Sequence, residues 1–138
     1  MSRIVALDVG DVRIGVAATD ELGITVAPRK TIERTASIKA DIRSIVELLD
    51  KLEAEKVVMG YPLNQFGEEG PQAVKTKEFY ERLARRIAIP VVLWDERFST
   101  EEAEEELLRM DLSRNQRKKV IDQMAAVNIL RSYLESNK

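Results

Sequence analysis

Two short apolar runs open the chain, and a turn separates them. The runs cover residues 4–9 and 13–19, both rich in β-branched side chains, and Gly10 begins the turn. Runs of this length bounded by turn residues are typical of neighbouring strands in a β-hairpin. Residues 23–32 predict a third strand that is irregular at Pro28, and a proline inside a strand favours an edge position in the sheet.

The pattern then changes to helical spacing. Isoleucine and leucine recur every three or four residues from Ile38 to Leu52, which predicts an amphipathic helix with Ser37 as its N-cap. A short buried strand over residues 56–61 follows, and Pro71 occupies the first position of a second helix. The predicted inner stripe of that second helix is Thr76, Tyr80, Leu83 and Ile87.

The last third of the chain predicts one more strand and two helices. The strand covers residues 91–94, and a capping box over residues 99–102 opens a helix that ends near Met110. A final helix runs from Arg114 to about Leu134. Its predicted apolar face is Val120, Met124, Val127, Leu130 and Leu134.

The predicted order is therefore β-β-β-α-β-α-β-α-α, without a linker or an internal repeat. Three strands in succession followed by two helix-linked strands favour an α/β fold with a mixed five-stranded sheet and helices on both faces. The handedness rule for crossovers makes the first, fourth and fifth strands parallel neighbours if the first lies centrally. We expect residues 1–138 to form one domain.

Asp8 interrupts the first apolar run. A run without alternation indicates a strand buried on both faces, where a lone ionised carboxylate costs several kcal/mol or more. Asp8 therefore needs a partner, which could be a cation, backbone N–H groups or a metal ion.

Composition narrows the chemistry that is available. The chain contains neither cysteine nor histidine, which excludes thiol chemistry, a Ser-His-Asp triad and an ordinary zinc site. An enzyme of this composition would most simply use carboxylates with Mg²⁺ or Mn²⁺. No apolar run approaches the roughly 20 residues that span a bilayer and no signal-peptide pattern is present, so we expect a cytoplasmic protein.

Three acidic positions are predicted to converge. Asp8 lies near the end of the first strand, Asp95 and Glu96 end the last strand, and parallel strands gather functional groups at their C-terminal ends. Asp122 shares a side of the final helix with the small residues Ala125 and Ala126, which would let the helix approach the sheet closely. Three such carboxylates suit one Mg²⁺ or Mn²⁺ ion, or two ions roughly 4 Å apart. The alternatives are a local ion pair after the last strand and an exposed Asp122.

The net charge of −2 does not by itself indicate nucleic-acid binding, but basic residues cluster. One cluster opens the final helix and another ends the second helix, and both could neutralise phosphates. The alternative for each is a solvated helix face. The two clusters are Arg114, Arg117, Lys118 and Lys119, and Arg82, Arg85 and Arg86.

Four blocks also resemble a known family. Residues 7–17 (LDVGDVRIGVA), 60–71 (GYPLNQFGEEGP), 94–100 (WDERFST) and 118–130 (KKVIDQMAAVNIL) are similar, in order, to the YqgF (RuvX) family. This family comprises bacterial pre-16S rRNA nucleases within the ribonuclease H-like superfamily. The resemblance covers the chain from end to end. It departs mildly at Gln65-Phe66, where a more polar pair is expected, and at Phe98, where leucine is commoner.

The resemblance implies a ribonuclease H-like fold and a divalent-metal nuclease acting on RNA or branched DNA. Its acidic residues fall on Asp8, Glu96 and Asp122. The residues that it and the charge pattern nominate for nucleic-acid contact are Arg13, Asn64, Arg97, Arg114, Arg117, Lys118 and Lys119.

Several functions remain open from the sequence. We favour processing of the 5′ end of 16S rRNA precursors over Holliday junction resolution, because a resolvase needs two sites related by a two-fold axis. A homodimer is compatible with either function. Other readings are a nucleic-acid-binding module whose site depends on a partner, and an actin-like ATPase, whose Asp-x-Gly turn is similar but which needs a second domain.

Overall fold

The computed structural model describes residues 3–96 and 114–137. In chain order its elements are β1 (Arg3–Val9), β2 (Arg13–Thr19), β3 (Val26–Glu33), α1 (Ile38–Lys51), β4 (Ala54–Tyr61), α2 (Pro71–Arg86), β5 (Val91–Asp95) and α4 (Arg114–Ser136). The helix predicted from residue 99 to Met110 lies outside the described residues.

The strands form one five-stranded sheet in the order β3-β2-β1-β4-β5. β1 pairs antiparallel with β2 and parallel with β4, while β4 pairs parallel with β5. This confirms the predicted mixed sheet with the first strand at its centre. Because β1, β4 and β5 run the same way, their C-terminal ends meet at one edge of the sheet.

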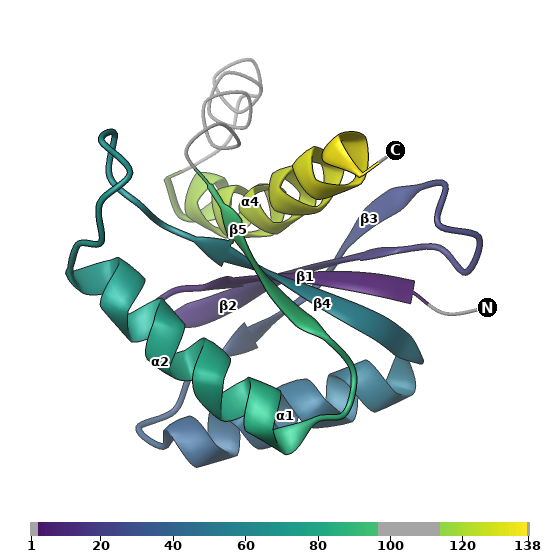
Figure 1. Cartoon of the computed structure of the whole chain (residues 1–138), viewed down its shortest axis with the longest axis horizontal. Helices are drawn as coiled ribbons and strands as arrows, with labels where there is room; N and C mark the ends of the chain where they lie inside the picture. Colours follow the sequence, from purple (N-terminus) through teal and green to yellow (C-terminus); the bar gives the residue numbers. More distant parts are fainter. Residues whose placement is uncertain (1–2, 97–113, 138) are drawn as a thin grey trace.

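Helices cover both faces of the sheet (Figure 1), with α1 and α2 on one side and α4 on the other. Successive residues of a strand point to opposite faces, and the buried residues divide accordingly. Val5 and Leu7 of β1 pack with α1 and α2, whereas Ala6 packs with α4. The double coverage explains why the strands read as continuous apolar runs.

β3 lies at the outer edge of the sheet, as Pro28 predicted. Pro28 pairs with Ala17 of β2, and the register slips between Ile14 and Val16. Proline has no N–H to offer to a ladder, so it is tolerated where one side of the strand is unpaired. The strand begins at Val26, three residues later than the pattern suggested.

The helices follow their predicted starts. Ser37 caps α1 by accepting a hydrogen bond from the Ala40 N–H at 3.2 Å, and Pro71 occupies the first turn of α2. The inner stripe of α2 needs one correction, because Phe79 is buried and Tyr80 only half-buried. Positions 79 and 80 flank the centre of the buried face, and the phenolic hydroxyl of a tyrosine favours the position nearer to water.

The inward face of α4 is broader than its predicted stripe. Val127 and Leu130 are buried as expected, but Ala126, Ile129 and Tyr133 are buried as well and pack on the sheet. Small residues such as Ala126 let this helix lie close to the strands. Within the described residues, no helix is long and apolar enough to cross a membrane.

Candidate active site

Asp8 lies on the face of the sheet that α4 covers. Ile4 and Ala6 pack in the cluster beneath α4, and Asp8 takes the next position on the same face because side chains alternate along a strand. Asp8 is half-buried and lies opposite Gly15 of β2. It therefore sits at the C-terminal end of β1, between strands on both sides.

Gly60 opens the space between β1 and β5. It follows Met59, the partner of Leu7, and lies opposite Trp94 of β5. A Cβ atom at this position would overlap Glu96 Oε1 and lie 2.7 Å from Glu96 Cδ. The Glu96 carboxyl group therefore lies over Gly60, where another residue would have its side chain. Gly60 belongs to β4, the strand between β5 and the strand of Asp8.

Glu96 is held where β5 ends. Its backbone N–H donates to the carbonyl oxygen of Tyr61 at 3.2 Å, which continues the β4–β5 pairing by one residue. Burial raises the pKa of Glu96 to about 9, aided by the charge of Asp8, a hydrogen bond with Asp8 and the charge of Asp95. A carboxyl–carboxylate bond needs a proton, so the Asp8–Glu96 pair carries one at neutral pH when no cation neutralises it.

Asp122 belongs to α4, but its side chain lies outside the described residues. Four residues farther on, Ala126 packs against the sheet. Among the residues that the structure describes, no group of three acidic side chains could hold a metal ion. The proposal that Asp122 completes the set with Asp8 and Glu96 therefore stays a prediction.

The structure describes the side chains of only some of the residues that were predicted to contact nucleic acid. Arg13 is half-buried at the start of β2, opposite Glu33 of β3. Arg97 lies outside the described residues. Four others open α4, where the structure describes their helical backbone but not their side chains: Arg114, Arg117, Lys118 and Lys119.

Asn64 organises the loop that follows β4. Its side-chain oxygen accepts hydrogen bonds from the backbone N–H groups of Phe66 and Glu68, both at 2.9 Å. The Tyr61 hydroxyl donates to Glu69 at the far end of the same loop, and this bond raises the pKa of Tyr61 to about 12. Asn64 thus has a structural role, beside which its predicted contact with nucleic acid remains a prediction.

The second basic cluster lies away from the carboxylates. α2 begins after the C-terminal end of β4 and runs back along the sheet (Figure 1), so its last turn reaches the opposite edge from Asp8. Arg82, Arg85 and Arg86 are exposed there, and Arg82 pairs with Glu78 at 3.3 Å. Of the two readings of this cluster, the solvated helix face fits its position better.

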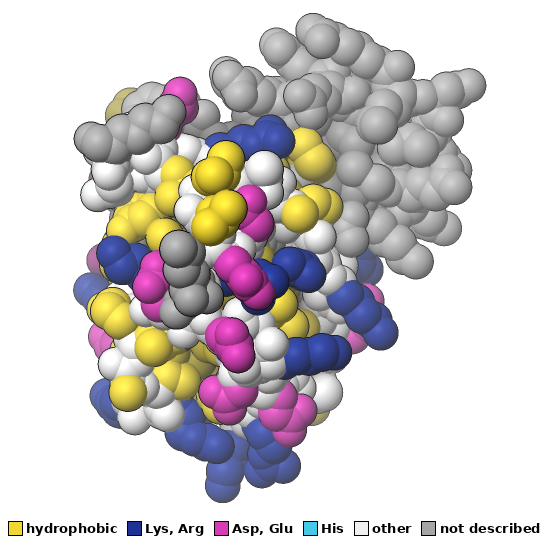
Figure 2. All heavy atoms as spheres, turned by 90° about the vertical axis from the view of Figure 1, so that its right-hand side faces the viewer, with side chains coloured by type: hydrophobic (Ala, Val, Ile, Leu, Met, Phe, Trp, Pro, Cys, Tyr) yellow, Lys and Arg dark blue, Asp and Glu magenta, His cyan; other side chains and the backbone are white. Residues whose placement is uncertain are grey.

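A second view of the surface shows mixed charge. In Figure 2, which looks onto the right-hand side of Figure 1, lysine and arginine side chains lie interspersed with aspartate and glutamate ones. A polyanion is attracted by clustered positive charge. The intermixed charges of the described residues on this face therefore give no indication of a phosphate-binding surface.

Two residues of the site region were not singled out from the sequence. Gly60 carried a signal, because a glycine inside a buried strand often marks a close approach by another group. Arg34 carried none, since it stands in a polar connection between β3 and α1. In the structure it reaches the turn after Asp8, where its Nη1 donates to the Gly10 carbonyl oxygen at 3.0 Å.

Known proteins are similar to this chain over nearly its whole length. A family model described as "RuvX: Holliday junction resolvase" matches residues 2–136. A protein of Desulforudis audaxviator named "Putative pre-16S rRNA nuclease" is 46% identical over 136 residues, which are 99% of this chain and 96% of that protein. A protein of Caldanaerobacter subterraneus subsp. tengcongensis with the same name is 47% identical over 137 residues, covering 99% and 98% of the two chains.

Solved structures with low sequence identity share the fold. Thermus thermophilus RuvC in complex with Holliday junction substrate has a TM-score of 0.63 at 14% identity, covering 100% of this chain and 98% of that one. The fowlpox virus resolvase bound to junction DNA has a TM-score of 0.61 at 17% identity, covering 98% of each chain. The likeness confirms the predicted ribonuclease H-like fold.

Proposed function

Because the chain belongs to the RuvX family, we propose that it is a divalent-metal-dependent nuclease that processes the 5′ end of 16S rRNA precursors. The relatives that cover nearly all of the chain carry the corresponding name. The observation that carries the proposal is the meeting of Asp8 and Glu96 over Gly60. We also propose that residues 1–138 act as one domain in the cytoplasm, where bacterial ribosomes are made.

The donor set fits a hard divalent cation. Asp8 and Glu96 offer only carboxylate oxygens, which Mg²⁺ and Mn²⁺ prefer. The raised pKa of Glu96 shows that two negative charges are costly here without a cation, and Gly60 leaves space for the carboxyl group between the strands. We propose that Asp8, Glu96 and Asp122 hold one or two such ions.

In such a site the cation would activate water and stabilise charge on the phosphate group. The protein's own residues have separate tasks. Glu96 and Asp8 would hold the cation, and because its charge would replace the proton that the two groups share, both would bind it as carboxylates. The phosphate backbone of the substrate is contacted by Arg13, Asn64, Arg97 and the basic residues that open α4. This binding weakens as the salt concentration rises.

Cleavage of two substrates tests the proposal. Purified protein is incubated with a 16S rRNA precursor fragment and with a four-way DNA junction, in Mg²⁺ or Mn²⁺, alongside a control nuclease. We expect the RNA to be cut, and Asp8→Asn to abolish cleavage while its urea unfolding transition stays cooperative. If neither substrate is cut while the control nuclease is active, catalysis by this chain alone is wrong.

Holliday junction resolution is the second candidate, favoured by the description of the family and by the fold shared with RuvC. It requires paired cuts in opposing strands and therefore two sites in a homodimer. Symmetric junction cleavage together with a dimeric mass in solution would replace the RNA assignment. Salt-dependent binding without turnover, unaffected by Asp8→Asn, would instead indicate a binding module.

A further inference from the structure

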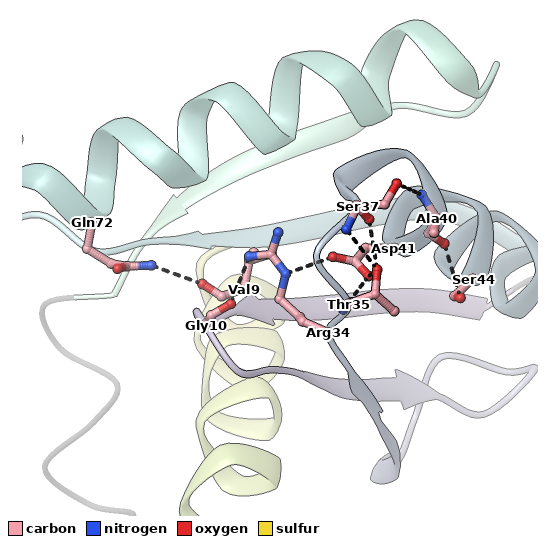
Figure 3. A network of polar contacts seen from close by, with 9 residues as sticks. All are labelled: Val9, Gly10, Arg34, Thr35, Ser37, Ala40, Asp41, Ser44 and Gln72. Carbon is pink, nitrogen blue, oxygen red and sulfur yellow. Dashed lines mark hydrogen bonds and ion pairs between the residues drawn. The ribbon is translucent and has the colours of Figure 1, made fainter.

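The turn that follows Asp8 is tied to a neighbouring loop by one arginine. Arg34 reaches across from the connection between β3 and α1, and its Nη1 donates to the Gly10 carbonyl oxygen at 3.0 Å (Figure 3). The backbone N–H of Arg34 also donates to the Val12 carbonyl oxygen at 2.9 Å. Arg34 therefore contacts the turn at two points, through its side chain and through its backbone.

Arg34 is itself held by a buried carboxylate. Its Nε donates to Asp41 Oδ2 at 3.1 Å, and Asp41 is only 1% exposed on α1. The other oxygen of Asp41 accepts hydrogen bonds from the backbone N–H and the hydroxyl of Thr35, both at 2.9 Å. On its flat side, the guanidinium group lies 5.2 Å from the ring centre of Phe79. These contacts leave the guanidinium group little freedom to move.

Contacts within the turn of residues 10–13 also restrict its backbone. The Gly10 N–H donates to the Arg13 carbonyl oxygen at 3.0 Å, and a Cβ atom on Gly10 would lie 2.9 Å from that oxygen. From α2, Gln72 Nε2 lies 3.4 Å from the Val9 carbonyl oxygen (Figure 3). Arg34 supplies the shorter of these two side-chain bonds to the chain just after Asp8.

We propose that Arg34 is a positioning residue: it fixes the turn of residues 10–13 and, through it, the orientation of Asp8 and Arg13. The inference rests on the proposed nuclease function, because positioning matters only if Asp8 acts on a substrate. An arginine suits the task because its planar group presents several N–H donors in a fixed fork. One edge can then bind Asp41 while another binds Gly10.

Arg34→Lys separates this role from simple stabilisation. A lysine keeps the positive charge beside Asp41, but its single ammonium group cannot reproduce the fixed fork to Asp41 and Gly10. We expect kcat to fall about tenfold with KM within about twofold, because small misplacement of a reacting group costs rate more than binding. Thr35→Ala is the matched control. It removes the hydroxyl's bond to Asp41 and its two bonds with the Ser37 backbone, and it leaves both bonds of the Arg34 side chain in place.

Hydrogen exchange of the free protein gives a readout that does not depend on cleavage. In Arg34→Lys, the Gly10 amide should exchange at least tenfold faster than in the wild type. The Val58 amide lies in β4, which pairs with a strand on each side. Its exchange rate should be much less affected, because exchange there needs wider unfolding than local opening of the turn. In Thr35→Ala, the Gly10 amide should keep its wild-type rate after correction for stability.

The outcomes separate the two proposals. If Arg34→Lys cuts RNA like the wild type, or if Thr35→Ala loses as much kcat at equal stability, the positioning role is wrong while the nuclease proposal stands. If the wild type cuts nothing, the nuclease proposal fails and so does positioning for catalysis. The exchange rate of Gly10 then still decides whether Arg34 anchors the turn.

Discussion

Gly60→Ala is the substitution with the most direct consequence for the site. Its Cβ atom would overlap the Glu96 carboxyl group, and it would lie 2.7 Å from Glu96 Cδ and 2.5 Å from Ile129 Cδ1. Carbon atoms in contact normally lie about 3.5–4.0 Å apart. Glu96 and the α4 side chain must therefore each retreat by about 1 Å, or β4 must shift.

The magnitudes follow from that displacement. Overfilling a packed interior costs about 1–3 kcal/mol, which outweighs the roughly 0.8 kcal/mol that one buried methyl group contributes. Moving a reacting group by about 1 Å can lower the rate about 100-fold. We therefore expect Gly60→Ala to lose about 1–3 kcal/mol of unfolding free energy and about 100-fold in kcat.

Urea unfolding and single-substrate cleavage measure these two effects. Gly70→Ala is the matched control, because a Cβ atom at Gly70 meets nothing within 4 Å. Gly70 is the N-cap of α2, where alanine is a poorer cap than glycine, so we expect a cost of no more than about 1 kcal/mol and unchanged kcat.

A second substitution identifies the clash. Ile129→Val removes the Cδ1 atom and by itself costs about 0.5–1.5 kcal/mol. In a protein that already carries Gly60→Ala, Ile129→Val should cost less unfolding free energy than it does alone. The coupling energy between the two substitutions should be at least about 0.5 kcal/mol. Wild-type stability and activity in Gly60→Ala, or strict additivity in the double variant, would refute the close approach of Glu96 and α4 at Gly60.

Three further predictions concern charge and packing. The pKa of Glu96 is raised from 4.5 to about 9, so between these pH values the folded protein without metal binds more protons than the unfolded chain. Its stability therefore falls as pH rises through that range. Glu96→Gln should remove this fall, measured as the urea midpoint at each pH. Burial opposes ionisation of Asp41, but hydrogen bonds from Thr35 and Arg34 outweigh it and lower the pKa of Asp41. The stability that ionised Asp41 contributes is present above its ordinary pKa and is lost as pH falls through the lowered pKa. Asp41→Asn should therefore be less stable than the wild type at neutral pH, and its stability should change less in acid. Tyr133→Ala should cost about 3 kcal/mol or more and shift the emission of Trp94, the single tryptophan, whose ring meets Tyr133 edge-on at 5.4 Å; an unchanged emission maximum would contradict the docking of α4 on β5.

The fold could be predicted because its signals are local. The hairpin around Gly10, the cap at Ser37 and the helix start at Pro71 each depend on a few adjacent residues, and each is found in the structure. Pro28 even predicted the edge of the sheet. Tyr80 was the wrong choice for the inner stripe of α2, where Phe79 is the buried residue, because helical spacing alone does not separate positions 79 and 80.

The site could be predicted only in part, because its geometry depends on distant parts of the chain. The acids Asp8 and Glu96 stood out as charges near strand ends, and the structure brings them into contact. The role of Gly60 depends on which strand lies between β1 and β5, and no local pattern specifies that. Arg34 acts through a backbone carbonyl 24 residues away, which side-chain spacing does not reveal.

The outer strand of the sheet has a consequence for how this protein meets other copies of itself. An exposed edge strand is a template onto which another chain can add, and such addition leads to aggregation. β3 carries Pro28 followed by Arg29 and Lys30, which together remove a donor and place positive charges along that edge. Growth of the sheet by strand addition at β3 is therefore disfavoured, so copies of this protein would have to meet through other surfaces.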